Sequence, residues 1–375
     1  MMKALMLAPM GSVHRRFNRA NIIALQRLGY QVDLVANFEN GDGPEAHNGE
    51  YVDECIGNGI KAYSIPFKRH SLWGNLSCIP KIRRLLLDNQ YDIVHAHTET
   101  GGLLLRLVAG IKGNSRFFYT PHGMSFWKGS SLKSQLVYRP LEHWICSCMD
   151  MNLGMNREEL DVLRSWNENT SAFVHGIGLD LKRFYTDERS RCDVRSEFGV
   201  TEEDTLIVSV GELDDNKNHS VVIKALSHLS NPNFKYVICG VGPNRDNLIQ
   251  MAVNVGIQDK VALAGYRSDI PDILSAADLF VFPSFHEGLP VSALEAMACG
   301  LPIICSKIRG NVDIVKDGQN GFLFEPTDNK VLAALIRKIM EDKPLGSNFG
   351  EYNKRFVNKF SQEAVVVELS KLYKI

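Results

Sequence analysis

The sequence predicts an α/β protein with two parallel β-sheets, each packed against helices. Short apolar runs typical of buried strands alternate with helix-like segments along the whole chain. A length of 375 residues exceeds one ordinary hydrophobic core, so two domains are expected. A glycine-rich stretch at residues 175–180 separates two series of strands and reads as the linker between the domains.

The expected elements follow one another in order. The first series of strands is predicted at residues 3–8, 32–36, 62–65, 93–95, 117–120 and 151–153, with helices at 16–28, 76–87, 103–111, 132–146 and 157–166. The second series of strands is predicted at residues 205–210, 236–239, 261–263, 279–282, 303–305 and 321–324, and residues 361–375 form a last helix. We therefore predict domains over 1–174 and 175–360. Two such sheets facing one another leave a cleft at the carboxyl ends of their strands, where α/β proteins usually bind ligands.

Composition limits the possible classes of protein and the cellular compartment expected for it. No run approaches the 18 consecutive apolar residues that predict a membrane-spanning helix. The apolar N-terminus is too short for a signal peptide and fits a first buried strand. The eight cysteines lack paired metal-ligand spacing, so reduced thiols in a cytoplasmic protein are expected. No basic stripe interleaved with aromatic residues appears, so we expect no nucleic-acid partner.

Two glutamates spaced eight apart, Glu287 and Glu295, are the most informative feature. A predicted strand ends just before Glu287, and Gly288 and Pro290 then open a helix that carries Glu295. At 3.6 residues per turn, position i+8 returns to roughly the same side of a helix. A helix N-terminus attracts phosphate, and carboxylates accept hydrogen bonds from hydroxyls, so this arrangement suits a nucleotide-sugar. Taken alone, the pair fits a solvated helix equally well.

The sequence segments around this pair resemble those of the retaining glycosyltransferases of family 4, and the resemblance covers nearly the whole chain. This family has the GT-B fold, two Rossmann-like domains facing each other across a cleft. The matching segments, in the order of the family, are residues 94–97, 119–123, 210–218, 240–243, 263–270, 284–304 and 317–324. The resemblance implies that residues 1–174 bind the acceptor, that residues 175–360 bind a nucleotide-sugar donor, and that the helix 361–375 packs back on the first domain.

The resemblance also implies roles for residues on the donor side. Glu287 matches the glutamate that contacts the donor sugar, and Glu295 matches the one that holds the ribose. Lys217 matches a cation of the donor diphosphate. The backbone and side chains of a further segment, Tyr266 and Arg267, match the nucleobase site. The remaining expected donor contacts are Gly288, Leu289, Pro290, Gly242 and Gly11.

Two departures from the family pattern concern the diphosphate. The position usually held by arginine carries Glu212, and a carboxylate beside a diphosphate repels it. Either Glu212 turns away from the site, or another base such as Arg267 neutralises the phosphates. The double glycine of the first loop is reduced to a single residue, Gly11.

On the acceptor side, His122 follows a predicted strand and is our second catalytic candidate. A histidine there can hydrogen-bond a sugar hydroxyl or assist charge development at the anomeric carbon. Without the resemblance, a structural role would be favoured for a single histidine. For His95, close to the end of another strand, we expect packing rather than catalysis.

The sequence predicts a site without a resident cofactor or metal. It contains no Asp-x-Asp, the motif with which glycosyltransferases of the other major fold hold a divalent cation, and no P-loop motif. Helix N-termini and Lys217 would then stabilise the leaving phosphates. Retention of configuration follows either from front-face attack or from double displacement through a carboxylate, and the sequence leaves both open.

The expected reaction moves a hexose or N-acetylhexosamine from a UDP-sugar to a polyprenyl-pyrophosphate-linked oligosaccharide in surface polysaccharide biosynthesis. Residues 1–165 hold 19 basic and 15 acidic side chains and the remainder 23 and 28, so the first half is the more basic. Two clusters, at 68–73 and 81–87, suit contact with the inner membrane face, and they suit solvated surfaces equally well.

Two rival functions stay open. A nucleotide-sugar epimerase of similar architecture would consume UDP-N-acetylglucosamine without releasing UDP. A non-catalytic nucleotide-sugar-binding subunit, with Glu212 marking a decayed site, would bind UDP without turnover. The intact pair of Glu287 and Glu295 speaks against decay.

Overall fold

The computed structural model describes residues 1–39, 48–68, 73–184, 188–229 and 233–374. The chain divides into two compact units, residues 1–178 with 362–375, and residues 179–361. The sequence places the boundary four residues earlier, at 174/175. The chain passes from one unit to the other twice, after residue 178 and after residue 361. These two segments lie next to each other, because the backbone N–H of Leu179 donates to the carbonyl of Phe360 at 2.8 Å.

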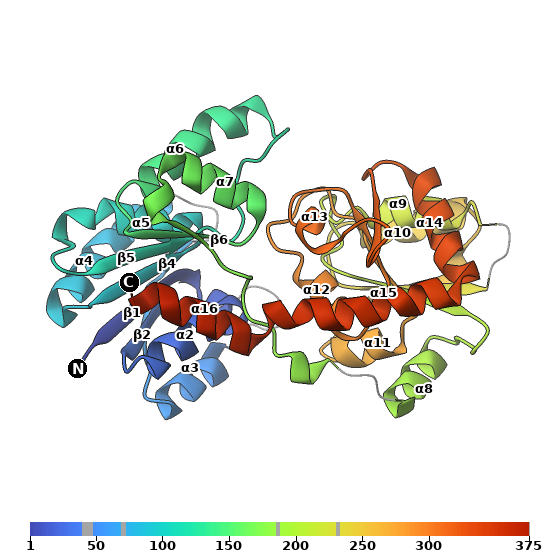
Figure 1. Ribbon diagram of the computed structural model, residues 1–375, viewed down its shortest axis with the longest axis horizontal. Helices are drawn as coiled ribbons and strands as arrows, with labels where there is room; N and C mark the ends of the chain where they lie inside the picture. The colour runs from blue at the N-terminus through green and yellow to red at the C-terminus, as the bar shows by residue number, and fades with distance from the viewer. Residues whose placement is uncertain (40–47, 69–72, 185–187, 230–232, 375) are drawn as a thin grey trace. The chain divides into compact units, whose positions relative to one another are not determined.

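The first unit is a seven-stranded parallel sheet of order β3-β2-β1-β4-β5-β6-β7 (Figure 1). Its strands are β1 (Lys3–Met10), β2 (Gln31–Asn37), β3 (Lys61–Ser64), β4 (Ile93–His97), β5 (Arg116–Thr120), β6 (Met151–Gly154) and β7 (Ser171–Phe173). Its helices are α1 (Gly11–Phe17), α2 (Arg19–Arg27), α3 (Asn48–Gly57), α4 (Ile79–Asn89), α5 (Thr98–Leu107), α6 (Arg139–Cys146), α7 (Arg157–Trp166) and α16 (Gln362–Lys374), with a π-helical turn η3 (Ser134–Tyr138) before α6.

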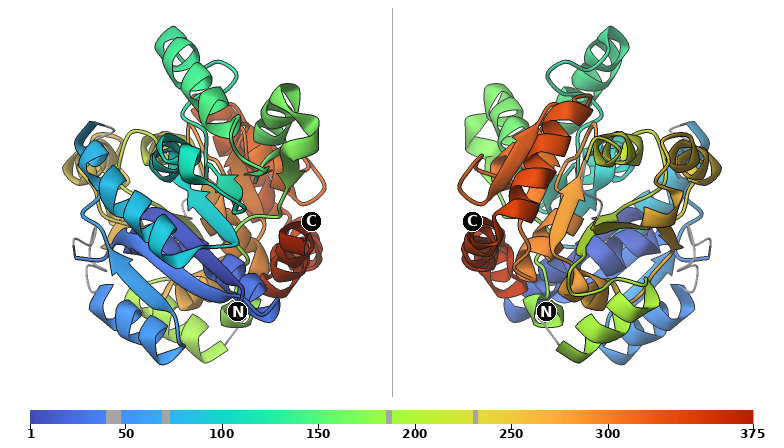
Figure 2. Two further views of the ribbon diagram at one scale, coloured as in Figure 1. Left: turned by 90° about the vertical axis from the view of Figure 1, so that its left-hand side faces the viewer. Right: turned by 90° about the vertical axis from the view of Figure 1, so that its right-hand side faces the viewer.

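Two hydrophobic cores cover the two faces of this sheet. Along β1, Ala4 and Met6 enter one core while Leu5 and Leu7 enter the other. This is the alternation that a strand with both faces covered requires. The view of the first unit in Figure 2 shows the twisted sheet between its helices.

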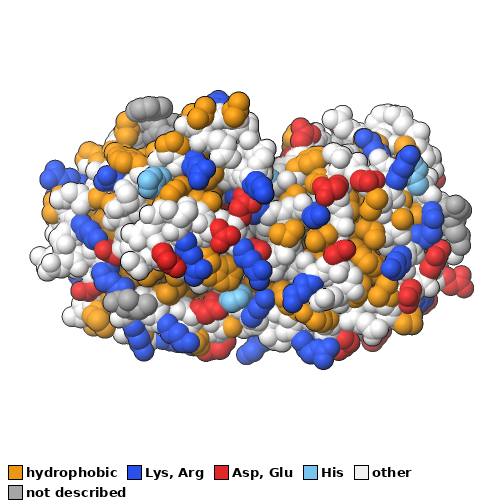
Figure 3. Space-filling view, turned by 45° about the horizontal axis from the view of Figure 1, so that its top comes forward, with side chains coloured by type: hydrophobic (Ala, Val, Ile, Leu, Met, Phe, Trp, Pro, Cys, Tyr) orange, Lys and Arg blue, Asp and Glu red, His pale blue; other side chains and the backbone are white. Residues whose placement is uncertain are grey.

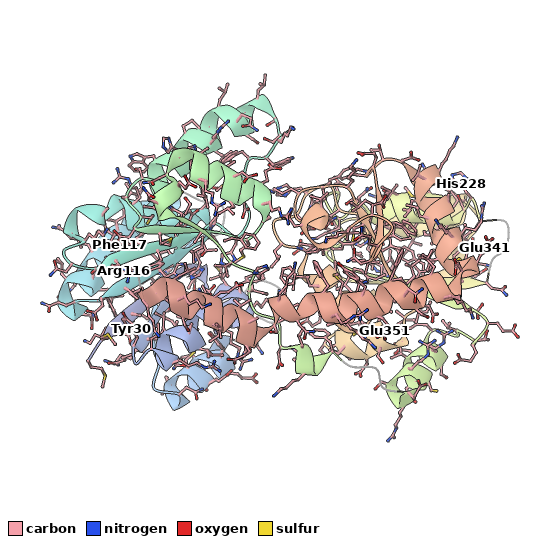
Figure 4. All side chains as sticks on the ribbon, in the orientation of Figure 1. Tyr30, Arg116, Phe117, His228, Glu341 and Glu351 are labelled. Atoms are coloured by element: carbon pink, nitrogen blue, oxygen red, sulfur yellow. The ribbon has the colours of Figure 1, made fainter. Side chains whose placement is uncertain are left out.

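Helix α16, from the end of the chain, belongs to the first unit. It packs on α2, and the guanidinium of Arg116 donates to the carbonyl of Tyr373 at 3.0 Å. Figure 4 labels this arginine beside the sheet. The hydroxyl of Tyr373 lies under the carboxyl end of the sheet, where it meets Asn21 and His95. The last helix therefore helps to fix the end of the sheet that carries the candidate site.

The second unit is a six-stranded parallel sheet of order β10-β9-β8-β11-β12-β13. Its strands are β8 (Thr205–Val210), β9 (Phe234–Cys239), β10 (Val261–Gly265), β11 (Leu279–Phe282), β12 (Ile303–Ser306) and β13 (Gly321–Phe324). Its helices are α8 (Glu188–Glu197), α9 (His219–Leu226), α10 (Arg245–Asn254), α11 (Ile270–Ala276), α12 (Val291–Ala298), α13 (Asn311–Ile314), α14 (Asn329–Glu341) and α15 (Lys343–Phe356). The imidazole of His228, labelled in Figure 4, bonds Asn329 at 2.8 Å and so joins the end of α9 to the start of α14.

The predicted fold class is confirmed: each unit is an open parallel sheet wound with helices, as in Rossmann-like domains. All twelve strands expected from the sequence are present, with small shifts at their ends. The prediction missed β7, a three-residue strand, and the first predicted helix is divided at Asn18 into α1 and α2. None of the helices in the described parts of the chain combines the length and apolarity that crossing a bilayer requires.

Candidate active site

The candidate donor residues lie where the winding of the second sheet reverses. Strands β8 and β11 are neighbours in the sheet although two other strands separate them in sequence. The loops that follow such a pair diverge, and α/β proteins bind ligands in the space between them. Lys217 lies in the loop after β8 and Glu287 in the loop after β11. The fold thus brings together two residues 70 positions apart.

Lys217 and Glu287 form a direct ion pair. The ammonium Nζ lies 2.7 Å from Glu287 Oε1, and the two side chains are 22% and 12% exposed. The same ammonium lies 5.6 Å from the ring centre of Phe282, at the end of β11. A carboxylate and an aromatic face therefore hold the charge of the lysine at the carboxyl end of the strands.

Hydrogen bonds from two asparagines fix the loop after β8 against the loop after β11. Asn216 donates to the carbonyl of His286 at 3.1 Å, and Asn218 donates to the carbonyl of Pro283 at 3.1 Å. Asn218 has a φ of 52°, in the left-handed region that asparagine tolerates better than most residues. The positions of Lys217 and Glu287 follow from this bracing.

Helix α12 starts one residue later than the sequence suggests. Pro290 is the residue before the first helical residue, Val291, rather than part of the first turn. Glu287 lies in the loop, as predicted, and Glu295 is the fifth residue of the helix, partly buried. Gly288 and Leu289 lie between Glu287 and the helix, and the Leu289 carbonyl accepts from the backbone N–H of Val291 at 2.9 Å.

The two glycines after β9 lie so close to the backbone of a neighbouring loop that a side chain would not fit there. A Cβ on Gly240 would lie 1.8 Å from the carbonyl oxygen of Gly211, and one on Gly242 would lie 2.5 Å from that of Leu213. These loops therefore pack directly on one another beside Lys217, whose side chain in turn lies against Gly211. The predicted contact of Gly242 with the donor stays a prediction.

The proposed nucleobase residues follow β10. Tyr266 is 42% exposed. The guanidinium of Arg267 is held by two carboxylates, with hydrogen bonds of 3.0 Å to Glu197 and 2.8 Å to Asp269. Because two acidic groups already offset its charge, this arrangement does not favour Arg267 as the base that would compensate Glu212. The side chain of Glu212 itself is exposed.

Sequence reasoning missed Arg309, which follows β12 and lies against the Glu287 loop. It is 8% exposed, its guanidinium donates to Nε2 of His286 at 2.5 Å, and its Nε lies 3.4 Å from the carbonyl oxygen of Glu287. The neighbouring Gly310 has a φ of 81° and approaches the same loop, since a Cβ there would lie 2.8 Å from the Gly288 carbonyl oxygen. A charged residue followed by glycine just after a buried strand was the available signal.

In the first unit, histidines gather at the carboxyl ends of β4 and β5. Nδ1 of His97 lies 2.9 Å from Nε2 of His122, and the rings of His95 and His97 are 4.1 Å apart. His95 bonds the hydroxyls of Tyr373 and Thr120 through its two nitrogens, at 2.7 and 2.9 Å. Both nitrogens of His95 are thus engaged within the fold, which agrees with the packing role expected for it.

The backbone at this edge of the sheet adopts unusual conformations. His122 has a φ of 57°, and Thr98, the first residue of α5, has a φ of 66°, which a β-branched side chain rarely adopts. Among the described residues, Nε2 of His97 and Oγ1 of Thr98 are buried and lack a hydrogen-bond partner. Backbone strain and unsatisfied polar atoms are concentrated at functional sites in proteins. Gly11, buried at the start of α1, follows the neighbouring strand β1.

The histidines are held neutral by burial. Burial lowers the pKa of His122 to about 4, and a nearby histidine, His14, adds to the effect. Burial likewise lowers the pKa of His14 to about 4 and that of His97 well below its usual value. At neutral pH these rings exchange hydrogen bonds without carrying charge. In the described parts of the chain, no three His, Cys, Asp or Glu side chains form a group that could hold a metal ion.

Comparison with known proteins identifies the family. Residues 17–181 match the family described as Glycosyltransferase Family 4, and residues 191–356 match Glycosyl transferases group 1. The chain is 30% identical over 358 residues to the Bacillus subtilis relative EpsD, covering 93% of this chain and 90% of the relative. It is 29% identical over 335 residues to the Escherichia coli protein named UDP-Gal:alpha-D-GlcNAc-diphosphoundecaprenol alpha-1,3-galactosyltransferase, covering 86% of this chain and 85% of the relative.

Solved structures share the whole fold. The crystal structure of Anabaena Alr3699/HepE in complex with UDP-glucose covers 100% of both chains with a TM-score of 0.81 at 19% identity. Sucrose-phosphate synthase from Thermosynechococcus elongatus covers 99% of this chain and 98% of its own, with a TM-score of 0.82 at 20% identity. At these identities the likeness concerns the fold. The chain therefore belongs to the family 4 glycosyltransferases and is a transferase with the GT-B fold.

Proposed function

We propose that this enzyme transfers a hexose or N-acetylhexosamine from a UDP-sugar to a lipid-linked oligosaccharide, with retention of the anomeric configuration, in the synthesis of a surface polysaccharide. The observation that carries the proposal is the ion pair of Lys217 and Glu287 between the loops of β8 and β11. A relative supports it, because the Escherichia coli protein is named as a galactosyltransferase acting on a diphosphoundecaprenol-linked sugar.

In this proposal the second unit holds the donor. Lys217 and the start of α12 face the diphosphate, Glu287 accepts hydrogen bonds from the sugar hydroxyls, and Glu295 accepts them from the ribose. The base lies against Tyr266 and the backbone beside it. As the bond from the anomeric carbon to the diphosphate oxygen breaks, negative charge grows on the diphosphate, and the ammonium of Lys217 stabilises it. The step as proposed uses no divalent cation.

The first unit supplies the acceptor side. A neutral His122 can accept a hydrogen bond from the attacking hydroxyl, and His97 holds its ring in place through the 2.9 Å contact. The acceptor oxygen forms the new bond to the anomeric carbon, and its proton passes to the leaving phosphate in front-face attack. In double displacement a carboxylate first takes the sugar. Both routes keep the same stereochemistry.

An exposed apolar surface in the first unit supports a membrane-bound acceptor. In and around η3 and α6, Leu132 is 80% exposed, Leu136 74%, Val137 53% and Trp144 41%. Basic side chains border this surface, and the guanidinium of Arg106 lies 4.5 Å from the Trp144 ring centre. Figure 3 shows hydrophobic side chains interspersed with Lys and Arg on the visible face of the first unit. Apolar groups rimmed by cations suit an anionic bilayer surface.

The sequence predicted two clusters that could contact the membrane, at 68–73 and 81–87, and the structure describes the second of them more fully than the first. On α4, Lys81, Arg83 and Arg84 are exposed, and Leu87 is 54% exposed, so this cluster also reaches solvent. Of the other cluster, Lys68 is exposed, whereas Arg69, His70 and Leu72 lie outside the described residues. Peripheral attachment to the inner membrane face therefore stays a proposal, with the surface of residues 132–144 as its strongest support.

Vesicle binding tests the membrane proposal. Vesicles containing anionic phospholipid should co-sediment with the wild-type enzyme, and Leu136→Glu combined with Val137→Glu should weaken this binding at least about tenfold, because two apolar anchors are lost and two repelling charges are added. Val331→Glu, at a valine on α14 that is 43% exposed, is the control. Equal binding by all three proteins would remove this surface from the proposal, and Leu87→Glu then tests α4.

Thermal stabilisation by nucleotide-sugars tests the donor class. A UDP-sugar present at about 100 times its dissociation constant should add roughly 2.7 kcal/mol to the free energy of unfolding, and GDP-sugars should add less. A panel of UDP- and GDP-sugars measured by scanning fluorimetry checks this. Stabilisation by GDP-sugars alone would contradict the proposed donor. Consumption of UDP-N-acetylglucosamine without UDP release would favour the epimerase instead.

A further inference from the structure

Glu99, in the first turn of α5, lies beside the histidines of the proposed acceptor side. Two contacts join the end of β4 and the start of α5 to the loop after β5. Nδ1 of His97 lies 2.9 Å from Nε2 of His122, and the hydroxyl of Ser125 donates to Glu99 Oε2 at 2.8 Å. The second contact follows the first along both segments of the chain. The carboxylate is therefore held next to the pair of histidines.

The fold uses only part of the Glu99 carboxylate. Among the described residues it makes one hydrogen bond, through Oε2, and no ion pair, so Oε1 has no protein partner there. The side chain is partly buried, and burial raises its pKa, against which the bond from Ser125 acts. Glu159, in contrast, accepts from the backbone N–H groups of Met124 and Met155 with its two oxygens, at 3.0 and 3.4 Å. Glu159 is thus satisfied as a brace of the same loop, whereas Glu99 keeps an acceptor atom available.

The two residues before Glu99 also carry polar atoms that the fold does not pair. Within the described parts of the chain, Nε2 of His97 and Oγ1 of Thr98 are buried and have no hydrogen-bond partner. The His97 side chain is fully buried, and the backbone of Thr98 has a φ of 66°. A strained backbone that carries unpaired polar atoms is typical of a binding site. The segment from His97 to Glu99 therefore has hydrogen-bonding capacity for a ligand.

The chemistry of Glu99 suits the sugar of the acceptor rather than its diphosphate. An ionised carboxylate only accepts hydrogen bonds, and it repels phosphate. Sugar hydroxyls donate hydrogen bonds and carry no charge. A hydroxyl near the attacking one can thus meet Glu99 while the attacking hydroxyl meets His122.

Resting on the proposed function, we propose that Oε1 of Glu99 accepts a hydrogen bond from a hydroxyl of the acceptor sugar, near the hydroxyl that attacks, and so selects the acceptor. Such a bond is charge-assisted and therefore stronger than one between neutral groups. An acceptor without this hydroxyl leaves a partly buried carboxylate unpaired, and sites built in this way discriminate strongly against such analogues. Glu99 then acts on acceptor binding and not on donor binding.

Kinetics with polyprenyl-diphosphate-linked N-acetylglucosamine as acceptor test this role. The variant is Glu99→Gln, whose amide can keep a hydrogen bond to Ser125 but carries no charge. We expect kcat/KM for the acceptor to fall roughly 10- to 100-fold, with UDP affinity by calorimetry within about threefold of the wild type, because only a hydrogen bond to a charged group is lost. Glu158→Gln is the control, since this first-turn glutamate of α7 accepts from the backbone N–H of Lys128 in the same loop at 2.8 Å. It should change neither quantity.

Acceptor analogues make the test specific to the proposed contact. Each analogue lacks one of the hydroxyls that is not attacked, and each is compared in the wild type and in Glu99→Gln. For one analogue, kcat/KM of the wild type should fall as far as it falls in Glu99→Gln with the complete acceptor, and the variant should show no further loss. Equal further losses in both proteins with every analogue would overturn the contact. If the variant folds poorly, the wild type decides alone, because an equal kcat/KM with all analogues leaves no hydroxyl for Glu99 to bind.

Ser125→Ala separates acceptor binding from bracing of the loop. It removes the bond between the loop and Glu99 but keeps the carboxylate, so its kcat/KM for the acceptor should fall less than that of Glu99→Gln. If Glu99 only braces the loop, Ser125→Ala should cost at least as much as Glu99→Gln. Unchanged kcat/KM in Glu99→Gln would overturn the inference and leave the proposed function standing. A wild-type enzyme that transfers no sugar to the lipid-linked acceptor would overturn the proposed function itself.

Discussion

Replacing Glu287 by alanine is expected to lower sugar transfer about 100- to 1,000-fold while leaving the fold intact. The carboxylate is only 12% exposed and is held 2.7 Å from Lys217, so it is positioned in advance of donor binding. Losing one fixed polar group that acts on the transition state costs a factor of this size in other enzymes. The measurement is kcat/KM with a saturating acceptor and varied UDP-sugar.

Two variants make the Glu287 result interpretable. Glu287→Gln keeps the shape and a hydrogen-bond acceptor, so it should retain more activity than alanine. Glu351→Ala changes an exposed glutamate on α15, labelled in Figure 4, and should match the wild type. Unchanged turnover in Glu287→Ala would remove this residue from the mechanism. An unfolded Glu287→Ala protein would instead assign it to the loop bracing.

Replacing His122 by asparagine should lower kcat roughly 100-fold or more and leave UDP affinity unchanged. Asparagine is the appropriate substitution, because it tolerates the left-handed backbone that His122 adopts. It removes the ring nitrogen that would meet the attacking hydroxyl, and general acid–base groups commonly contribute 10²- to 10⁴-fold. His228→Asn, at an exposed histidine of the second unit, serves as the control.

The pH profile gives an independent readout for His122. Because burial lowers its pKa to about 4, the ring is neutral from pH 5 upward, and the part of kcat that depends on it should be flat from pH 5 to 8. A fall in kcat centred near pH 6.5 that disappears in His122→Asn would contradict a buried neutral ring. Equal kcat in the variant and the wild type would exclude a catalytic role.

Much of the fold follows from local pattern. Buried strands such as residues 205–210 and 279–282 are short apolar runs closed by polar or glycine-rich loops, and their alternation with helices predicts parallel sheets. The order of these strands in the sheet then places the loops of Lys217 and Glu287 side by side. This is why residues chosen from motifs 70 positions apart prove to be in contact.

What the sequence did not predict depends on contacts between distant loops. In the sequence, Arg309 looks like an ordinary surface residue. In the fold it is buried beside Glu287, where Gly310 approaches the Gly288 carbonyl. The bond between His97 and His122 joins the ends of neighbouring strands, which no periodicity encodes. The pairing of Arg267 with Glu197 also spans 70 residues. Strand β7 was missed because a strand of three residues is too short to show a recognisable apolar pattern in the sequence.

We propose that the enzyme moves a sugar from a UDP-sugar to a lipid-linked acceptor with retention and without a divalent metal. The most direct test incubates it with a UDP-α-sugar and a polyprenyl-diphosphate-linked N-acetylglucosamine in the presence of a chelator, and analyses the product by NMR. The claim predicts an α-linked product and one UDP released per sugar transferred. A β-linkage, a strict need for added metal, or an altered UDP-sugar with no release of UDP would contradict it.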